Sequence, residues 1–165
     1  MTRIAIVEDE AAVREQLAGY VQRYTRQYGT PFEVTEFADG MEILEDYRPQ
    51  FDIIFLDVEM KHLDGMETAR RIREREPELP IVILTRPDFD FHAECAPRRE
   101  IIRATYEHAK AAGDENVYFL DGERFFGDED RDACTNDCTH PNDLGMYRMA
   151  KVIEPVLRGI LERAK

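Results

Sequence analysis

Several short apolar runs of the sequence end at polar residues that could carry out chemistry. These residues are Glu8, Asp9, Asp57 and Thr85. Apolar runs of this length predict strands that are buried on both faces of a parallel sheet. Ligands of such sheets bind outside the carboxyl ends of the strands, so we expect the four side chains to line one crevice. Three carboxylates in one crevice need a cation, and hard oxygen ligands favour Mg²⁺.

Strands alternate with helices along the rest of the sequence. The predicted strands are Ile4–Val7, Phe32–Phe37, Phe51–Leu56, Ile81–Leu84 and Val117–Leu120, and the predicted helices are Ala11–Tyr24, Met41–Tyr47, Met66–Glu76, Arg98–Ala112 and one from Asn142 or Asp143 to Arg163. We expect residues 86–97 and 123–141 to be loops. Repeated strand–helix units of this kind predict right-handed crossovers and an α/β fold with a parallel sheet.

Composition and charge limit the classes of partner. The chain has 165 residues, which fits one domain, and a formal net charge of -13. A chain this acidic repels nucleic acid and anionic lipid, so we expect neither nucleic acid nor a membrane as a partner. The three cysteines are Cys95, Cys134 and Cys138. An odd number of cysteines without a signal segment argues against a secreted disulfide scaffold and predicts a cytoplasmic protein.

Residues 1–85 resemble a response-regulator receiver domain. The resemblance rests on the segments IAIVEDE, FDIIFLDVEMKHLDGMETARRIRE and LPIVILT. It implies that Asp57 accepts a phosphoryl group from a histidine kinase and that the hydroxyl of Thr85 reads this group. The implied Mg²⁺ ligands are Glu8, Asp9, Asp57 and the backbone carbonyl of Glu59. A carboxylate is a weak nucleophile, so catalysis would come mainly from positioning and charge neutralisation.

The end of the fifth predicted strand departs from the receiver pattern. The family has a lysine there that pairs with the phosphoryl group, whereas this chain has Asp121. Lys61, which stands where many receivers have proline, and Arg86 are the candidates to replace that lysine. Because a cation that would bind the phosphoryl group is missing, we expect the conformational switch to be impaired.

Residues 86–165 resemble the C-terminal half of an SGNH (GDSL-like) hydrolase. The resemblance begins at TRPDFD and continues through VYFLDGERFFG and DxxHPNDLGxYRMA. It implies that Asp137 and His140 are two members of a Ser-His-Asp triad. The chain contains no serine. Loss of the nucleophile lowers triad catalysis on the order of 10⁶-fold, so we expect no enzyme activity beyond autophosphorylation from small phosphodonors.

The two resemblances meet at ILT-RPD without a linker. Each part lacks strands and helices that the other supplies. Together they predict one flavodoxin-like fold, a three-layer α/β domain over residues 1–165 with a five-stranded parallel sheet in order 2-1-3-4-5. Two separate domains would leave open sheet edges. Natural fusions keep domains whole, so we interpret the chain as an engineered chimera. A scaffold with neither parental activity is then the alternative to a phosphoacceptor module.

Two alternative metal sites involve His140. Its imidazole could join the acidic crevice and favour a transition metal over Mg²⁺. Cys134, Cys138 and His140 form a second set that lacks a fourth ligand. Reduced loop cysteines or a Cys134–Cys138 bridge are the other interpretations of this segment.

Apolar residues near the second predicted loop are expected to be structural. We expect Phe125 and Phe126 to anchor the loop. We also expect Met146, Tyr147 and Met149 to belong to the core.

Overall fold

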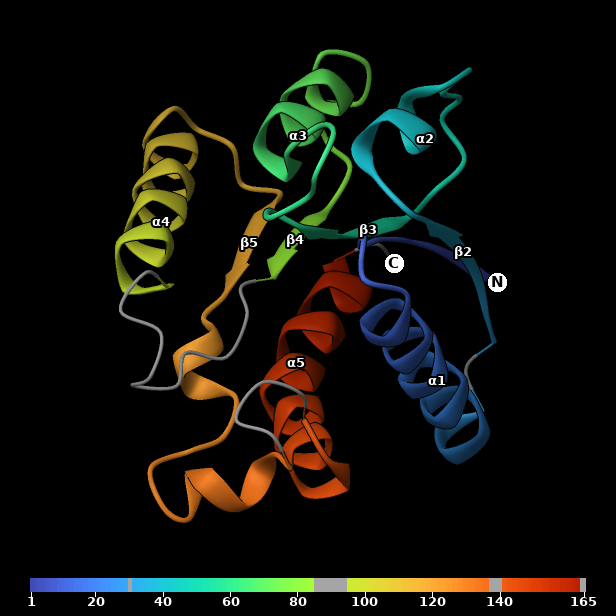
Figure 1. Ribbon diagram of the computed structural model, residues 1–165. Coiled ribbons are helices and arrows are strands. Elements are labelled where there is room, and N and C mark those ends of the chain that lie inside the picture. Colours follow the sequence, from blue (N-terminus) through green and yellow to red (C-terminus); the bar gives the residue numbers. More distant parts are fainter. Residues whose placement is uncertain (30, 85–94, 137–140, 164–165) are drawn as a thin grey trace. The chain divides into compact units, whose positions relative to one another are not determined.

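The computed structural model describes all residues except 30, 85–94, 137–140 and 164–165 (Figure 1). The elements in chain order are β1 (Thr2–Val7), α1 (Ala11–Tyr28), β2 (Phe32–Phe37), α2 (Gly40–Leu44), β3 (Ile53–Asp57), α3 (Gly65–Arg73), β4 (Ile81–Leu84), α4 (Cys95–Ala111), β5 (Val117–Leu120), the 3₁₀ turns Gly122–Arg124 and Arg131–Cys134, and α5 (Asp143–Arg163). The strands form one sheet in the order β2-β1-β3-β4-β5. The expected fold class and strand order are confirmed.

The spatial contacts between residues divide the chain into two compact units. The first consists of Met1–Ile83 and Ala109–Tyr118, and the second of Leu84–His108 and Phe119–Lys165. The boundary passes through β4 and β5 and not through a linker. The interpretation of residues 1–165 as a single domain stays a prediction.

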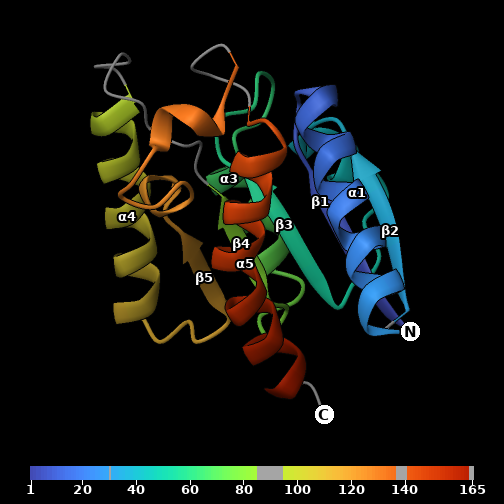
Figure 2. The same ribbon diagram turned by 90° about the horizontal axis from the view of Figure 1, so that it is seen from below.

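The first unit is built around β1, which pairs in parallel with β2 and β3. Ile4 lies opposite both Val34 and Ile53. The side chains of β1 from Ile4 onward and those of β3 are buried, as expected for strands covered on both faces. Helix α1 covers one face of these strands, and α2 and α3 cover the other (Figures 1 and 2). The sheet therefore has its apolar core on both sides, and its polar chemistry is left to the strand ends.

Acidic caps and one arginine set the ends of the helices in this unit. Asp39 accepts hydrogen bonds from the first backbone N–H groups of α2, and Asp64 accepts one from α3. Helix α3 is shorter than the predicted Met66–Glu76. Arg73, the last residue of α3, donates hydrogen bonds to the carbonyls of Glu76 and Leu79 and to the Asp114 carboxylate. The two carbonyls that follow the helix therefore have hydrogen-bond partners although the helix does not continue.

In the second unit, two 3₁₀ turns interrupt the loop that the sequence predicted. Phe125 and Phe126 are buried, which confirms that they anchor this segment. Arg148 of α5 donates hydrogen bonds to the carbonyls of Phe126 and Glu129, at 2.5 and 2.6 Å. The chain from Phe125 to Glu129 is therefore held by two buried aromatic side chains and by an arginine of α5.

Helix α5 buries one of the three apolar residues that we expected in the core and exposes another. Met146 is buried and Met149 is half-buried, but Tyr147 is 57% exposed. The expectation for Tyr147 was wrong because successive helical residues differ by about 100° in direction, so a buried Met146 turns Tyr147 outward. The ammonium of Lys151 lies 4.7 Å from the centre of the Tyr147 ring, which provides the exposed ring with a polar neighbour.

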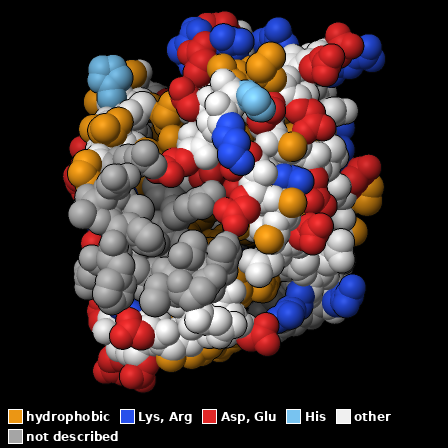
Figure 3. Space-filling model, in the orientation of Figure 1, with side chains coloured by type: hydrophobic (Ala, Val, Ile, Leu, Met, Phe, Trp, Pro, Cys, Tyr) orange, Lys and Arg blue, Asp and Glu red, His pale blue; other side chains and the backbone are white. Residues whose placement is uncertain are grey.

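Acidic and basic side chains share the surface. Figure 3 shows Asp and Glu side chains interspersed with Lys and Arg on the face that the view presents. Among the described residues, no helix has the length and apolarity that a bilayer span requires.

Gly65, the first residue of α3, is expected to be intolerant of a side chain. A Cβ atom there would lie 2.1 Å from the carbonyl oxygen of Asp57 and 2.9 Å from the Cα of Val58. We expect Gly65→Ala to lower the free energy of unfolding by about 1–3 kcal/mol, because backbone atoms must move to relieve the overlap. Gly19→Ala in α1 is the matched control, since its Cβ would meet nothing within 4 Å. The control should raise stability by about 0.5–1 kcal/mol. Urea unfolding measures both, and a stabilising Gly65→Ala would contradict the packing described here.

Candidate acidic cation site

Three carboxylates meet at one edge of the sheet. Glu8 and Asp9 directly follow β1, and Asp57 is the last residue of β3. Because β1 and β3 are parallel neighbours, their carboxyl ends lie at the same edge. One oxygen of each carboxylate lies within 4.8 Å of the others. Glu8 is only 4% exposed and Asp57 only 3%, so the site concentrates negative charge where little water can screen it.

The backbone around the site is held by hydrogen bonds from the loops and from α1. The Glu8 carboxylate accepts a hydrogen bond from the backbone N–H of Glu10 at 3.0 Å, and Asp57 Oδ1 accepts one from Val58 at 2.9 Å. Arg14 of α1 donates to the backbone carbonyl of Glu8 at 2.5 Å. Sequence reasoning did not identify Arg14. Its position one helical turn into α1 is the only signal, and many surface arginines share that feature.

The donor set fits a hard divalent cation. All three side chains offer carboxylate oxygens, and two of them are buried, so an ion would relieve repulsion that solvent cannot. Mg²⁺ prefers such oxygen ligands and retains several waters when it binds. Glu59, the predicted source of a backbone carbonyl ligand, lies in the loop after Asp57 with its side chain exposed.

A lysine already lies at this site. Nζ of Lys61 is 3.6 Å from Oδ2 of Asp9. Sequence reasoning named Lys61 as a candidate replacement for the family's strand-five lysine, and the structure places its ammonium beside a predicted metal ligand.

Other predicted site residues lie outside the described residues. They are Thr85, Arg86, Asp137, Cys138 and His140. The predicted hydroxyl reader, the acid–histidine pair and both sites that involve His140 therefore stay predictions. Cys134, which is described, is a buried free cysteine.

Asp121, the acid at the end of β5, lies among arginines of α4 within the second unit. Its carboxylate accepts a hydrogen bond from Arg103 at 2.5 Å, and Nε of Arg99 lies 3.5 Å away. Arg99 also pairs with Glu123 at 2.6 Å, and this hydrogen bond lowers the pKa of Glu123. The two arginines thus offset the charge of the acid that replaces the receiver lysine.

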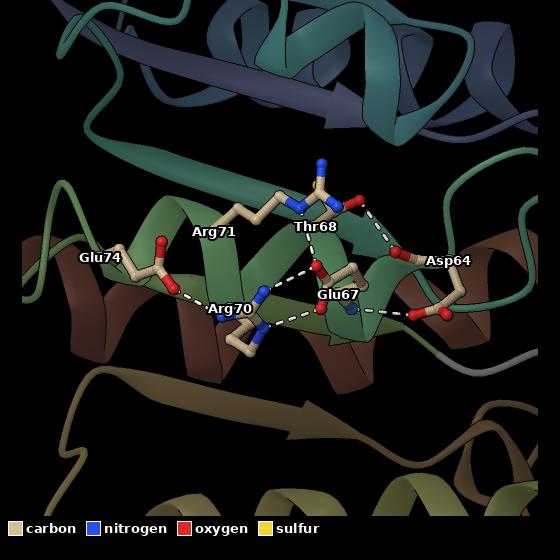
Figure 4. A network of polar contacts seen from close by, with 6 residues as sticks. All are labelled: Asp64, Glu67, Thr68, Arg70, Arg71 and Glu74. Carbon is tan, nitrogen blue, oxygen red and sulfur yellow. Dashed lines mark hydrogen bonds and ion pairs between the residues drawn. The ribbon is translucent and has the colours of Figure 1, made fainter.

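Helix α3 carries a network of polar contacts that extends from Asp64 before the helix to Glu74 at its end (Figure 4). Glu67 accepts hydrogen bonds from Arg70 and Arg71, and these lower the pKa of Glu67 to about 2. The hydroxyl of Thr68 donates to the backbone carbonyl of Asp64 at 2.9 Å. The network fixes the start of the helix that follows the Asp57 loop.

The fold agrees with the families that the chain matches. The chain belongs to the response regulator receiver domain family through residues 4–100 and to the GDSL-like lipase/acylhydrolase family through residues 57–158. The two matches share residues 57–100, which include the predicted junction after residue 85. The chain therefore joins a receiver part to a GDSL-like part.

Individual relatives support both parts. The transcriptional regulatory protein AfsQ1 of Streptomyces coelicolor is 36% identical over 85 residues, which are 52% of this chain and 35% of that protein. The chain thus spans about a third of the length of the curated relatives it matches. The chemotaxis protein CheY4 of Vibrio cholerae superposes with a TM-score of 0.56 at 19% identity, covering 94% of this chain and 98% of that one. A GDSL-like lipase of Bacteroides ovatus gives 0.71 at 22% identity, covering 98% and 54%. At these identities the two structures show the fold alone.

Replacing Asp121 with the lysine of the receiver pattern should destabilise the protein. Asp121→Lys would place a third cation beside Arg99 and Arg103 and leave them without their shared carboxylate. We expect the free energy of unfolding to fall on the order of 3 kcal/mol, with a smaller loss for Asp121→Asn. Urea unfolding measures this, with Asp128→Lys at an exposed position as the control for the change in charge. Equal stability of Asp121→Lys and the wild type would contradict the pairing.

The Glu67 network should make stability depend on pH. The folded pKa of about 2 lies below the ordinary value of 4.5, so Glu67 stabilises the fold above pH 4.5, and this contribution is lost as the pH falls towards 2. We therefore expect Glu67→Gln to be less stable than the wild type at pH 7, with a difference that closes on acidification. Urea unfolding between pH 7 and pH 2 measures this, and Glu107→Gln on α4 controls for loss of one charge. A constant difference across that range would contradict the expectation.

Proposed function

We propose that the chain is a receiver-like phosphoacceptor module with Asp57 as the phosphorylation site. The observation that carries this proposal is the carboxylate cluster at the ends of β1 and β3, inside the part that matches receiver domains. Glu8, Asp9, Asp57 and the backbone carbonyl of Glu59 are the proposed ligands of Mg²⁺. The hydroxyl of Thr85 is the proposed reader of the phosphoryl group.

The residues of the site would act mainly by positioning. An oxygen of the Asp57 carboxylate forms a bond to phosphorus while the bond from phosphorus to the donor atom breaks, and the electron pair leaves with the donor. The donor atom is an imidazole nitrogen in a phosphohistidine and an oxygen in acetyl phosphate. The hydrogen bond from Val58 to Asp57 Oδ1 holds the plane of the nucleophilic carboxylate. Glu8 and Asp9 would hold the ion, which when bound would supply charge neutralisation at the phosphoryl oxygens.

The phosphodonor in a cell is proposed to be a histidine kinase, and the protein is proposed to be cytoplasmic. Receiver domains of two-component systems interact with such kinases, and the chain belongs to that family over residues 4–100. Switching is proposed to be impaired, because Asp121 stands in place of the strand-five lysine and pairs with Arg99 and Arg103. AfsQ1 is a transcriptional regulatory protein, but this chain covers only 35% of it. The net charge of -13 supports the absence of direct nucleic-acid binding here.

The GDSL-like match raises ester hydrolysis as a second candidate function. The match covers residues 57–158, but the chain has no serine to act as the nucleophile. We propose that it does not hydrolyse esters. If the site also fails to accept phosphate, the remaining function is that of an engineered scaffold that keeps the fold of both families and the activity of neither.

Phosphorylation of Asp57 can be measured directly. We expect intact mass spectrometry after incubation with acetyl phosphate and Mg²⁺ to show one phosphoryl adduct on the wild type. The adduct should be absent from Asp57→Asn and absent when EDTA replaces Mg²⁺, because both the nucleophile and charge neutralisation are required. Asp128→Asn, at an exposed aspartate, is the matched control and should be labelled like the wild type.

Other outcomes of this experiment separate the alternatives. Labelling of Asp57→Asn would place the modification elsewhere. An unlabelled wild type with an intact circular dichroism spectrum would favour the scaffold. Turnover of p-nitrophenyl acetate above the rate in buffer would contradict the absence of esterase activity.

A further inference from the structure

Lys61 combines two properties that matter for the acidic site. Its ammonium lies 3.6 Å from Oδ2 of Asp9, and its side chain is 82% exposed, whereas that of Asp9 is only 12% exposed. The carboxylate is thus held in the site, and the lysine reaches it from solvent on a flexible stem. It belongs to the loop between Asp57 and α3.

The ammonium and a divalent cation would both use the carboxylate of Asp9. Asp9 is one of the three residues whose carboxylate oxygens lie within 4.8 Å of one another. An ion bound there would meet the Lys61 ammonium as a like charge, and the exposed lysine can move away without any change in the backbone. An ion pair whose lysine is solvent-exposed is weak, and its contact is readily exchanged for solvation of the ammonium.

We propose that Lys61 is a tethered cation that competes with a divalent metal ion for Asp9 and thereby sets the metal affinity of the site. In the metal-free protein its ammonium offsets part of the repulsion among Glu8, Asp9 and Asp57. Binding of the ion displaces the ammonium into solvent. This inference rests on the proposed function only in that the acidic site binds a divalent cation, and it does not require phosphorylation of Asp57.

The expected effect is modest because the ammonium of Lys61 is largely exposed to solvent. Removing the lysine charge should tighten Mg²⁺ binding about two- to fivefold, which is the range of exposed ion pairs. The effect should arise from charge and not from packing, because a side chain that is 82% exposed has few neighbours to lose. It should shrink towards unity at high salt, since the Debye length falls to about 3 Å at 1 M.

Isothermal titration with MgCl₂ at low ionic strength tests the inference on the full chain. We expect Lys61→Met to bind Mg²⁺ more tightly than the wild type by the factor given above, and Lys61→Arg, which keeps the charge, to bind like the wild type. Lys110→Met, an exposed lysine of α4, is the matched control for loss of one positive charge. It should also bind like the wild type.

Thermal unfolding provides a readout that does not depend on activity. In EDTA we expect a lower Tm for Lys61→Met than for the wild type, because the carboxylates lose a neighbouring cation. In saturating Mg²⁺ the two proteins should have the same Tm, since the ion has displaced the ammonium. A purely structural role for Lys61 would lower the Tm equally in both conditions and would overturn the inference.

The remaining outcomes distinguish this inference from the phosphoacceptor proposal. Equal Mg²⁺ affinities of the wild type and Lys61→Met, or no Mg²⁺ binding by either, would overturn the inference. So would the same gain for Lys110→Met. Tighter binding by Lys61→Met without an Asp57 adduct would support the inference and contradict the phosphoacceptor role. An Asp57 adduct together with Mg²⁺ affinities that do not depend on Lys61 would support the phosphoacceptor role and contradict the inference.

Discussion

Parallel pairing of β1 with β3 brings the carboxylates of Glu8, Asp9 and Asp57 to one edge of the sheet. The groups around the site compensate the negative charge that these carboxylates concentrate. Two of the three acids are buried, so their repulsion is poorly screened by solvent. The surrounding contacts are hydrogen bonds donated to these residues by backbone N–H groups and by Arg14, together with the exposed ammonium of Lys61. Each places a positive or partially positive group against the acidic edge. A bound divalent cation would offset the same negative charge with two charges on one ion.

In the second unit, a single carboxylate is likewise compensated by positively charged neighbours. Asp121 stands at the end of β5, where the receiver resemblance implies a lysine, and α4 supplies Arg99 and Arg103 to this carboxylate. Arginine suits this role because its guanidinium stays charged and presents several donors to one acid. The end of β5 is therefore balanced internally by residues of the GDSL-like part. A single substitution back to the receiver pattern would not recreate the receiver arrangement, because the neighbours of residue 121 have changed as well.

The two families share a sheet architecture, but they place their chemistry on different residues. The receiver part brings together Asp57 and the two acids that would hold a cation with it, whereas the chain has no serine for the chemistry of the GDSL-like part. Function depends on the site residues more than on the fold, so structural similarity to a lipase at 22% identity carries little weight against the missing nucleophile. The acidic edge is the place in the described part of the chain where three carboxylates of the receiver part lie together.

The sequence by itself determined the α/β class, the buried strands, the order of the sheet and the meeting of Glu8 and Asp9 with Asp57. These features follow from apolar runs, from the handedness of strand–helix units and from resemblance to known folds, all of which are local or are repeated along the chain. Only the tertiary structure decided that Lys61 lies against Asp9, that Arg14 holds the carbonyl of Glu8 and that Tyr147 faces outward. Such contacts depend on the rotation of each helix and on the reach of individual side chains, and neither quantity is encoded in residue spacing along the chain.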